Sequence, residues 1–290
     1  MKLTWGLLVG HLLALTFGLA GILIALPNPQ LWSGSPLGVQ VFTFGMEYAG
    51  SLHILLGAAA MVAFGVWRIG WRKTLLFFAA SVSISLASEL IGTTTGWPFG
   101  NYAYTEGLGP KVLGHVPYTI PLSWFYMGFA SYILAAAILD RFTPGARPWA
   151  AVALGSWLLL AWDVVLDPAM AHESLPIKFW VWSESGFFFG MPFKNLVAWY
   201  ATGLVFIGVG RLLWRSDLER PGALIWAPLV TYIANCVFAA FLSASIGLWQ
   251  PIPLAALVAL APVGVLALLG RGPGRRHPER PLEAVGAAGS

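Results

Sequence analysis

Long apolar stretches, separated by short polar or Gly/Pro-rich breaks, make up most of the chain. A membrane-spanning helix needs about 20 consecutive, mostly apolar residues. Eight stretches meet this requirement, namely residues 5–26, 46–67, 74–92, 120–139, 148–166, 196–214, 223–243 and 252–270. Proline and glycine mark the breaks, for example at residues 144–145 and 221–222. The pattern predicts an all-α, polytopic membrane bundle of about eight transmembrane helices.

The basic residues predict how this bundle is oriented. When the chain is threaded through eight spans, all but three of its 16 Lys and Arg residues fall on one side, the exceptions being Lys111, Lys178 and Lys194. Lys and Arg collect on the cytoplasmic side of membrane proteins. Both termini are therefore predicted to be cytoplasmic. The net charge of +4 follows from this bias and gives no reason to propose nucleic-acid binding.

The domain organisation follows from the same pattern. Residues 1–270 are predicted to form a single transmembrane helical domain. Residues 271–290 are Gly, Pro, Arg and Glu with few large apolar side chains, so a disordered cytoplasmic tail is expected there.

Three carboxylates lie inside or at the end of apolar stretches: Glu89, Asp163 and Asp167. A charged side chain at the centre of a spanning helix costs roughly 2.5–3.5 kcal/mol on insertion scales, so such residues usually face the bundle interior and mark function. Asp163 and Asp167 are four residues apart and share one helix face. His53 and Asn195 are predicted at the same depth, in the outer half of the membrane. Four helices thus bring polar groups to one level, which predicts a functional site.

Other polar residues in the apolar stretches have a simpler interpretation. Single polar side chains in membrane bundles often bridge two helices, for about 0.6 kcal/mol on average. His11, predicted near the cytoplasmic end of the first stretch, and Asn235, in the seventh, are expected to make such links. His53 taken alone would allow the same interpretation.

Two long loops, one after the third stretch and one after the fifth, are rich in aromatic residues, Gly and Pro and poor in charge. A loop over water would be more polar, so both are predicted to lie on the outer face and fold back over the carboxylates, where buried non-helical backbone is tolerated. Aromatic residues of these loops and of the fourth stretch are candidates for binding a substrate: Trp97, Phe99, Tyr102, Tyr104, Trp124, Trp180 and Trp182.

The residue inventory narrows the chemistry. The sequence has no Gly-rich phosphate loop and no Cys/His cluster with metal-ligand spacing, so no metal is expected. Carboxyl groups among many aromatic rings suit carbocation chemistry on an isoprenoid alkene. A buried carboxyl group can stay protonated near neutral pH and act as a general acid. Each aromatic face can stabilise the resulting tertiary cation by about 0.5–2 kcal/mol. The residues alone do not decide whether water then adds or a neighbouring alkene closes a ring.

Five sequence strings form a specific set. They are Ser-Glu-x-x-Gly at 88–92, Thr-Gly-x-Pro-Phe-Gly-x-Tyr-x-Tyr at 95–104, Val-Pro-x-x-Ile-Pro-Leu-x-Trp at 116–124, Asp-x-x-x-Asp-Pro at 163–168, and Trp-x-Trp followed by Gly-x-Pro-x-x-Asn between 180 and 195. Together they resemble the CruF-type carotenoid 1,2-hydratases, a family of integral membrane carotenoid biosynthesis proteins. The resemblance runs from about Glu47 to Trp214.

The resemblance implies addition of water across the terminal double bond of an acyclic carotenoid end, giving a tertiary alcohol. Lycopene-like, γ-carotene-like or bacterioruberin-precursor polyenes are the implied substrates, and hydration needs no redox cofactor. The expected partners are the carotenoid, water and the lipid bilayer of a bacterial or archaeal cell membrane, together with other carotenoid biosynthesis enzymes.

Five residues are predicted to carry the chemistry. Asp163 or Glu89 is expected to donate the proton, while the other and Asp167 tune it or orient water. His53 and Asn195 are expected to hold that water by hydrogen bonds.

Two alternatives stay open. The pair Asp163-x-x-x-Asp167 is similar to the magnesium diphosphate motif of UbiA-type membrane prenyltransferases, although a diphosphate site needs several carboxylates and basic residues. A non-enzymatic pigment-binding or transport protein is the other alternative, although the sequence shows no matched half-helices of the kind transporters use.

Overall fold

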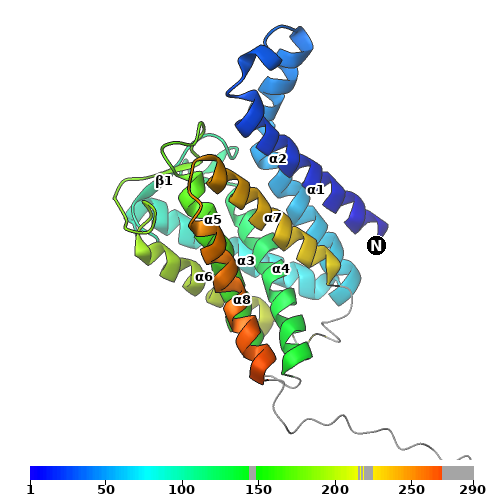
Figure 1. Ribbon diagram of the computed structural model, residues 1–290. Helices are drawn as coiled ribbons and strands as arrows, with labels where there is room; N and C mark the ends of the chain where they lie inside the picture. The colour runs from blue at the N-terminus through cyan, green and yellow to red at the C-terminus, as the bar shows by residue number, and fades with distance from the viewer. Residues whose placement is uncertain (144–147, 215, 217, 219–224, 270–290) are drawn as a thin grey trace, which may run out of the picture.

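Eight long helices form the molecule in the computed structural model, which describes residues 1–143, 148–214, 216, 218 and 225–269. They are α1 (Lys2–Ala20), α2 (Pro36–Ile69), α3 (Trp71–Thr95), α4 (Thr119–Phe142), α5 (Pro148–Met170), α6 (Phe193–Leu212), α7 (Trp226–Ser245) and α8 (Pro251–Leu269) (Figure 1). Each is long and apolar enough to cross a membrane, α1 with the π-helical turn Gly21–Ala25 that continues it. The predicted all-α bundle of eight spanning helices is confirmed. The predicted tail at 271–290 and the predicted breaks at 144–145 and 221–222 lie outside the described residues.

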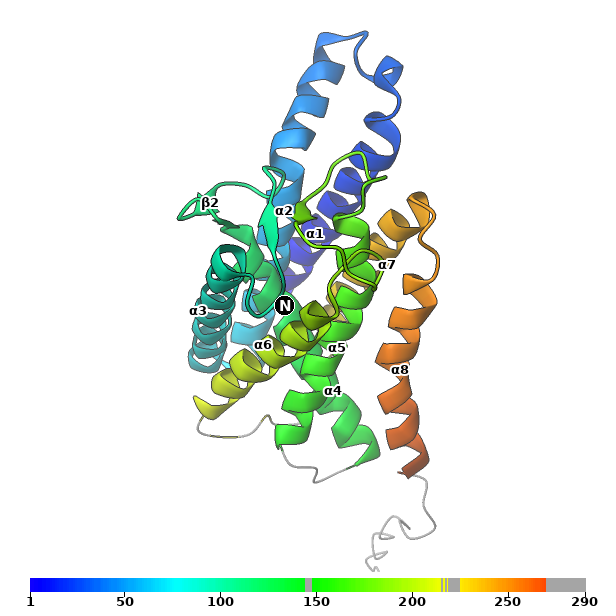
Figure 2. The ribbon, with the colours of Figure 1, turned by 90° about the vertical axis from the view of Figure 1, so that its left-hand side faces the viewer.

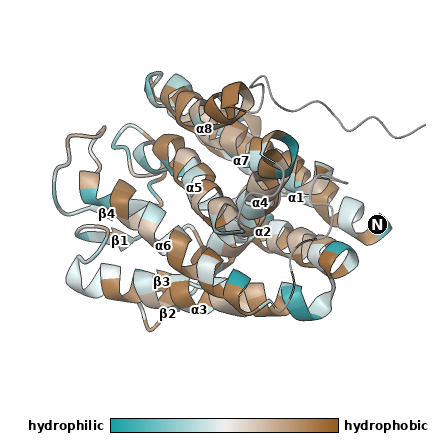
Figure 3. Ribbon diagram, turned by 90° about the horizontal axis from the view of Figure 1, so that it is seen from below, coloured by the Kyte–Doolittle hydropathy of each residue, from teal (hydrophilic) through white to brown (hydrophobic). Residues whose placement is uncertain are grey.

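The helices α4 and α5 form the centre of the bundle, since 78% of the residues in an 18-residue apolar segment of each helix are buried. The hairpin of α1 and α2 packs on one flank, α3 and α6 on another, and α7 and α8 on a third (Figures 1 and 2). Viewed along the bundle, hydrophobic residues cover outward-facing as well as inward-facing helix surfaces (Figure 3). Helix α8 is the least buried of the eight, because the buried share of its 18-residue apolar segment is 0%. Apolar surface on the outside suits a bundle whose solvent is lipid.

Helix α2 begins ten residues before the stretch predicted for it and extends the α1–α2 hairpin beyond the rest of the bundle (Figure 1). Its start is set by Ser35, whose Oγ accepts a hydrogen bond from the Gly38 N–H at 3.0 Å, and by Pro36 at the first helical position. The tip of the hairpin is closed by Trp32, whose ring stacks on Phe42 at 3.8 Å.

The two aromatic loops meet at one end of the bundle (Figure 2). Strand β1 (Tyr102–Tyr104) of the first loop pairs antiparallel with β4 (Trp180–Trp182) of the second, while β2 (Lys111–Val112) and β3 (Val116–Pro117) form a small hairpin. Alternate strand residues point to opposite faces. The outer residues of β1 and β4 therefore face the bundle while the middle residues, Ala103 and Val181, are exposed. The prediction that these loops fold back over the helices is confirmed.

The opposite end of the bundle carries several basic residues. Arg68 lies in the last turn of α2, Arg72 and Lys73 lie in the first turn of α3, and Arg211 lies in the last turn of α6. The indole N–H of Trp214, just after α6, donates to the carbonyl of Lys73 at 2.9 Å, so these helix ends meet. Which side of the membrane this end faces stays a prediction.

Candidate active site

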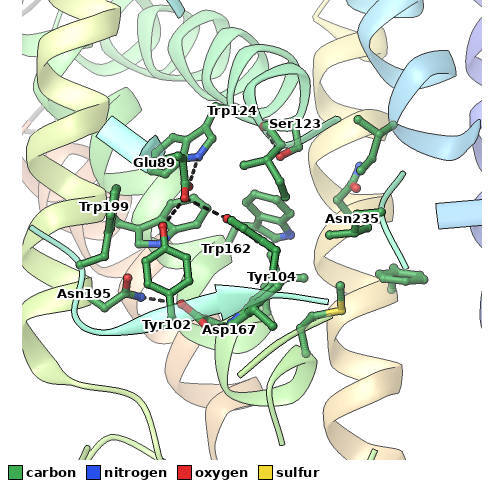
Figure 4. Close-up of a pocket in the computed structure, with 18 of the residues that line it drawn as sticks. Glu89, Tyr102, Tyr104, Ser123, Trp124, Trp162, Asp167, Asn195, Trp199 and Asn235 are labelled. Carbon is green, nitrogen blue, oxygen red and sulfur yellow. Dashed lines mark hydrogen bonds between the residues drawn. The ribbon is translucent and has the colours of Figure 1, made fainter. Parts of the chain in front are cut away.

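A cavity lies between the central helices and the paired loops (Figure 4). About 70 Å³ of it is wide enough for the centre of a water molecule. Ten predicted site residues line it: His53, Glu89, Phe99, Tyr102, Tyr104, Trp124, Asp167, Trp180, Trp182 and Asn195. The convergence of these residues follows from the alternating direction of the helices, which returns α3, α5 and α6 to the same end of the bundle.

Glu89 lies within the last two turns of α3 and is 3% exposed. Its Oε1 accepts a hydrogen bond from the indole N–H of Trp124 at 2.9 Å. Its Oε2 accepts from the hydroxyls of Tyr104, at 2.9 Å, and Tyr102 (Figure 4). Hydrogen bonds to a charged acceptor are roughly twice as strong as those between neutral groups. Helix α4 and strand β1 therefore supply three donors in place of a basic side chain.

The two tyrosines keep their protons. Burial raises the pKa of both the Tyr102 and Tyr104 hydroxyls well above their usual range, and the adjacent Glu89 charge acts in the same direction. Both therefore remain hydrogen-bond donors to Glu89 at physiological pH.

Asp163 and Asp167 converge on one amide group. Asp167 accepts from the Trp180 indole N–H at 2.6 Å through Oδ1 and from the Asn195 amide at 2.5 Å through Oδ2 (Figure 4). The same Asn195 nitrogen is 3.4 Å from Asp163 Oδ2. Asp163 is fully buried, and its Oδ1 has no hydrogen-bond partner within the described residues. The predicted shared face of the two Asp residues is present, but only Asp167 lines the cavity.

A second polar network at the cavity edge joins four helices, α1, α2, α4 and α7. His53 Nδ1 donates to the Ala49 carbonyl at 3.0 Å, and His11 Nδ1 donates to the His53 carbonyl at 2.7 Å. His11 Nε2 then accepts from the Asn235 amide at 3.0 Å, and the Asn235 oxygen accepts from the Tyr126 hydroxyl at 2.9 Å. The expected links of His11 and Asn235 between helices are present. The predicted difference in depth between His11, near the cytoplasmic end, and His53, in the outer half, is wrong, because the structure places their rings 6.3 Å apart.

Indole rings form much of the cavity wall. Trp124 stacks on Trp199 with centroids 3.9 Å apart and an interplanar angle of 24°, and Trp162 meets Trp199 edge-on at 5.9 Å. Sequence reasoning missed Trp162 and Trp199. Trp199 follows Asn195 by four residues, so helical periodicity would have placed it on the same face.

Other lining residues were also missed or given another role. Ser123, Tyr126, Met170 and Phe238 were not predicted for the site, and Asn235 was expected only as a link between helices.

Trp97 is the other predicted residue outside the cavity. Its side chain is 69% exposed, on the turn that follows Gly96. Gly96 has φ +75° and ends α3 in the left-handed conformation. The chain reverses there, leaving Trp97 outside while Phe99, two residues later, is buried.

The lining contains carboxyl groups, hydroxyls, amides and rings, and no Lys or Arg among the described residues. Nor is any group of three or more His, Cys, Asp or Glu side chains within the described part of the chain arranged to hold a metal ion. A diphosphate would therefore find no basic side chain in this cavity.

Comparisons with known proteins give the family. A family model described as "Carotenoid biosynthesis protein" matches residues 49–262. A protein of Haloarcula japonica named bisanhydrobacterioruberin hydratase is 28% identical over 264 residues, which cover 90% of this chain and 80% of that protein. No solved structure matches the chain.

Proposed function

We propose that this chain, which belongs to the carotenoid biosynthesis protein family, is a hydratase that adds water to the terminal double bond of an acyclic carotenoid end. The observation that carries the proposal is a buried cavity in which two carboxyl groups, Glu89 and Asp167, lie among indole and phenol rings with no Lys or Arg in the described lining. Such a site can donate a proton to an alkene and stabilise the cation that forms.

The acid in this proposal is Asp167. Two carboxylates close together in a site without a cation cannot both ionise without a large electrostatic cost, so such a pair retains a proton. Asp163 and Asp167 form such a pair around Asn195, and Asp167 is the member that faces the cavity. Asp167 donates this proton to the CH carbon of the terminal double bond. The positive charge then develops on the neighbouring carbon, which carries two methyl groups.

The cation is stabilised by the walls of the cavity. Trp124, Trp162 and Trp199 line it, and an aromatic face contributes about 0.5–2 kcal/mol toward a nearby cation. The Glu89 carboxylate adds a negative charge that its three hydrogen-bond donors hold in a fixed position. Preorganised charge of this kind is usually the largest single contribution to catalysis.

Water completes the reaction. Its oxygen bonds to the tertiary carbon and its surplus proton passes to Glu89, which leaves a tertiary alcohol. Return of that proton from Glu89 to the Asp pair restores the starting state, so one water is consumed and no redox change occurs. The Nδ1–H of His53 is used by the Ala49 carbonyl, which leaves Nε2 as an acceptor able to orient the water at the cavity edge.

The substrate is an acyclic end of a long polyene. Lycopene-like and γ-carotene-like molecules present such an end, and so do the bacterioruberin precursors to which the name of the Haloarcula japonica relative points. The apolar exteriors of the eight helices support delivery from the lipid bilayer, in which such substrates dissolve.

The experiment is expression in bacterial hosts that accumulate lycopene, γ-carotene or bisanhydrobacterioruberin, with pigments analysed by liquid chromatography and mass spectrometry. We expect products heavier by one or two waters with an unchanged chromophore spectrum, and no such product from the Asp167→Asn variant at equal protein level. A product heavier by a prenyl unit would replace the proposal with a prenyltransferase. Unchanged pigment in all three hosts would contradict hydration of these ends.

A further inference from the structure

A second hollow, much larger than the cavity, runs beneath the α1–α2 hairpin. Its volume is about 570 Å³ against 70 Å³ for the cavity. The end of α1 and the first half of α2 form most of it, and Gly107, Ile177 and Phe179 of the two aromatic loops close one side. We call it the hairpin groove. Along α2 it reaches from Ser35 to His53, which is about 27 Å at 1.5 Å per residue.

The hairpin groove is suited to an apolar ligand. Apart from the indole N–H of Trp32, the polar side chains in the described lining are those of Ser35 and His53. No Asp, Glu, Lys or Arg is among the described lining residues. Gly and Ala residues lie among large apolar side chains such as Phe17 and Phe42 in its walls, and some of these small residues border open space. At Gly21 nothing lies within 4 Å of where a Cβ would stand, and at Gly18 the nearest atom is 3.8 Å away.

The groove and the cavity adjoin each other. His53, Met170 and Phe238 line both of them. Met170 is an unbranched side chain that adapts its shape easily. The ring of Phe238 lies 5.7 Å from that of His53. These three side chains therefore form a constriction between a small polar chamber and a long apolar one.

The difference in volume shows how a long substrate must lie. An engineered cavity of about 150 Å³ in another protein holds one benzene molecule, so a 70 Å³ cavity admits little more than the end of a chain. The remainder of a polyene must lie elsewhere, and the hairpin groove borders the cavity.

We propose that the hairpin groove binds the polyene chain of the substrate, and that the reacting end passes between His53, Met170 and Phe238 to reach Asp167 and Glu89. This inference rests on the proposed function. It assigns to the α1–α2 hairpin, which lies away from the reacting groups, the role of recognising a long, rod-shaped, uncharged chain. It also explains why exposed apolar residues such as Ile24 and Leu37 border the groove, since the chain would enter from lipid.

The test fills the groove without disturbing the cavity. Gly21→Phe places a ring in open space inside the groove, and Gly18→Leu fills a neighbouring part as a second variant. Gly6→Phe is the matched control, because Gly6 lies on the same helix, also has nothing within 4 Å of its Cβ position and does not line the groove. Size-exclusion profiles and melting temperatures select variants that fold as the parent does.

Two readouts are taken in cells that accumulate lycopene. The first is hydrated product per unit of protein. The second is the lycopene that copurifies with the protein in an Asp167→Asn background, where it cannot react. We expect both groove variants to lower each readout at least tenfold, the change that 1.4 kcal/mol of lost binding produces. The Gly6→Phe control should leave both within twofold of the parent.

The outcomes separate this inference from the proposed function. Normal hydration and normal lycopene content in both groove variants would overturn the inference and leave the hydratase proposal intact, since the groove would then hold something else, such as a lipid acyl chain. Asp167→Asn protein that carries no lycopene would also overturn it. Lycopene that is bound by the parent and lost in the groove variants, without hydrated product from any protein, would support the groove and contradict the hydratase proposal.

Discussion

Replacing Asp167 by Asn, and separately Asp163 by Asn, is expected to give two very different enzymes. Asp167 faces the cavity and accepts hydrogen bonds from Trp180 and Asn195. Asp163 is buried behind it, with one 3.4 Å contact to Asn195 and one oxygen without a partner in the described structure. The substitutions have the same shape, so they differ mainly in whether the lost carboxyl group faces the substrate.

The expected magnitudes follow from these contacts. A positioned general acid contributes about 10²–10⁴-fold to the rate, which corresponds to roughly 2.7–5.4 kcal/mol. Asp167→Asn should lose that factor. At Asp163 the substitution weakens one long hydrogen bond, worth about 0.5–1.5 kcal/mol, and removes the neighbouring carboxyl group that favours the protonated form of Asp167. A roughly 2- to 12-fold loss is therefore expected at low pH, and the loss should grow as the pH rises. The NH₂ group of the new Asn side chain can take the position of Asp163 Oδ1, because no hydrogen-bond donor of the described residues faces that atom and would be repelled.

The assay compares initial rates of hydration in isolated membranes, using the carotenoid on which the wild-type protein is most active. Protein content is matched by immunoblot, because slow conversion over a long culture would hide a tenfold change. Glu89→Gln is included as a second cavity-facing substitution and should also lose about 10²-fold or more.

One pattern would refute the assignment. If Asp163→Asn lost about 10²-fold or more while Asp167→Asn stayed within about tenfold of wild type, Asp163 would be the proton donor. Equal retention of activity by the Asp167 and Glu89 variants would remove acid catalysis by this cavity altogether.

Further predictions concern the surroundings of the site. Tyr104→Phe removes one donor to Glu89 and should slow hydration roughly 10- to 150-fold in the same assay, since a hydrogen bond to a charged group is worth about 1.5–3 kcal/mol; a rate within twofold of wild type would show that this donor is dispensable. Because burial raises the pKa of Tyr104, its phenol stays protonated above its usual value of about 10, so a pH–rate profile should show no decline from its ionisation as the pH rises to about 10. Asn235→Leu leaves buried His11 without its amide partner and should lower the free energy of unfolding by about 1–2 kcal/mol, measured by thermal unfolding in detergent; an unchanged stability would contradict the link. A reporter enzyme inserted at exposed Leu113 should be located on the outer side of the membrane. Reporter activity in the cytoplasm would reverse the predicted orientation.

Several features of the fold were predictable because they depend on one-dimensional properties of the chain. The length of each apolar stretch matches the thickness of a bilayer, so the number of spanning helices could be counted. The chain reverses at each break, so Glu89, Asp167 and Asn195 could be placed at one depth. The aromatic, uncharged loops had to be buried against protein, and the pairing of β1 with β4 over the cavity agrees with this.

Other features depended on how helices slide and rotate against one another. Apolar helices can shift along their axes without changing the hydrophobic pattern, and for this reason the depth of His11 was wrong. The start of α2 was missed although Ser35 and Pro36 signal it, because a span counted from bilayer thickness stops after about 20 residues.

The sequence by itself thus determined the membrane bundle, the two covering loops and the set of carboxyl groups that meet beneath them, since composition and chain direction suffice for these. The tertiary structure decided which carboxyl faces the cavity, because Asp163 and Asp167 share a helix face and only the rotation of α5 against its neighbours separates them. It also decided that a long apolar groove adjoins the cavity at His53, Met170 and Phe238. The two hollows adjoin because α1 and α2 pack at an offset from the rest of the bundle, and such an offset is a property of packed helices in three dimensions.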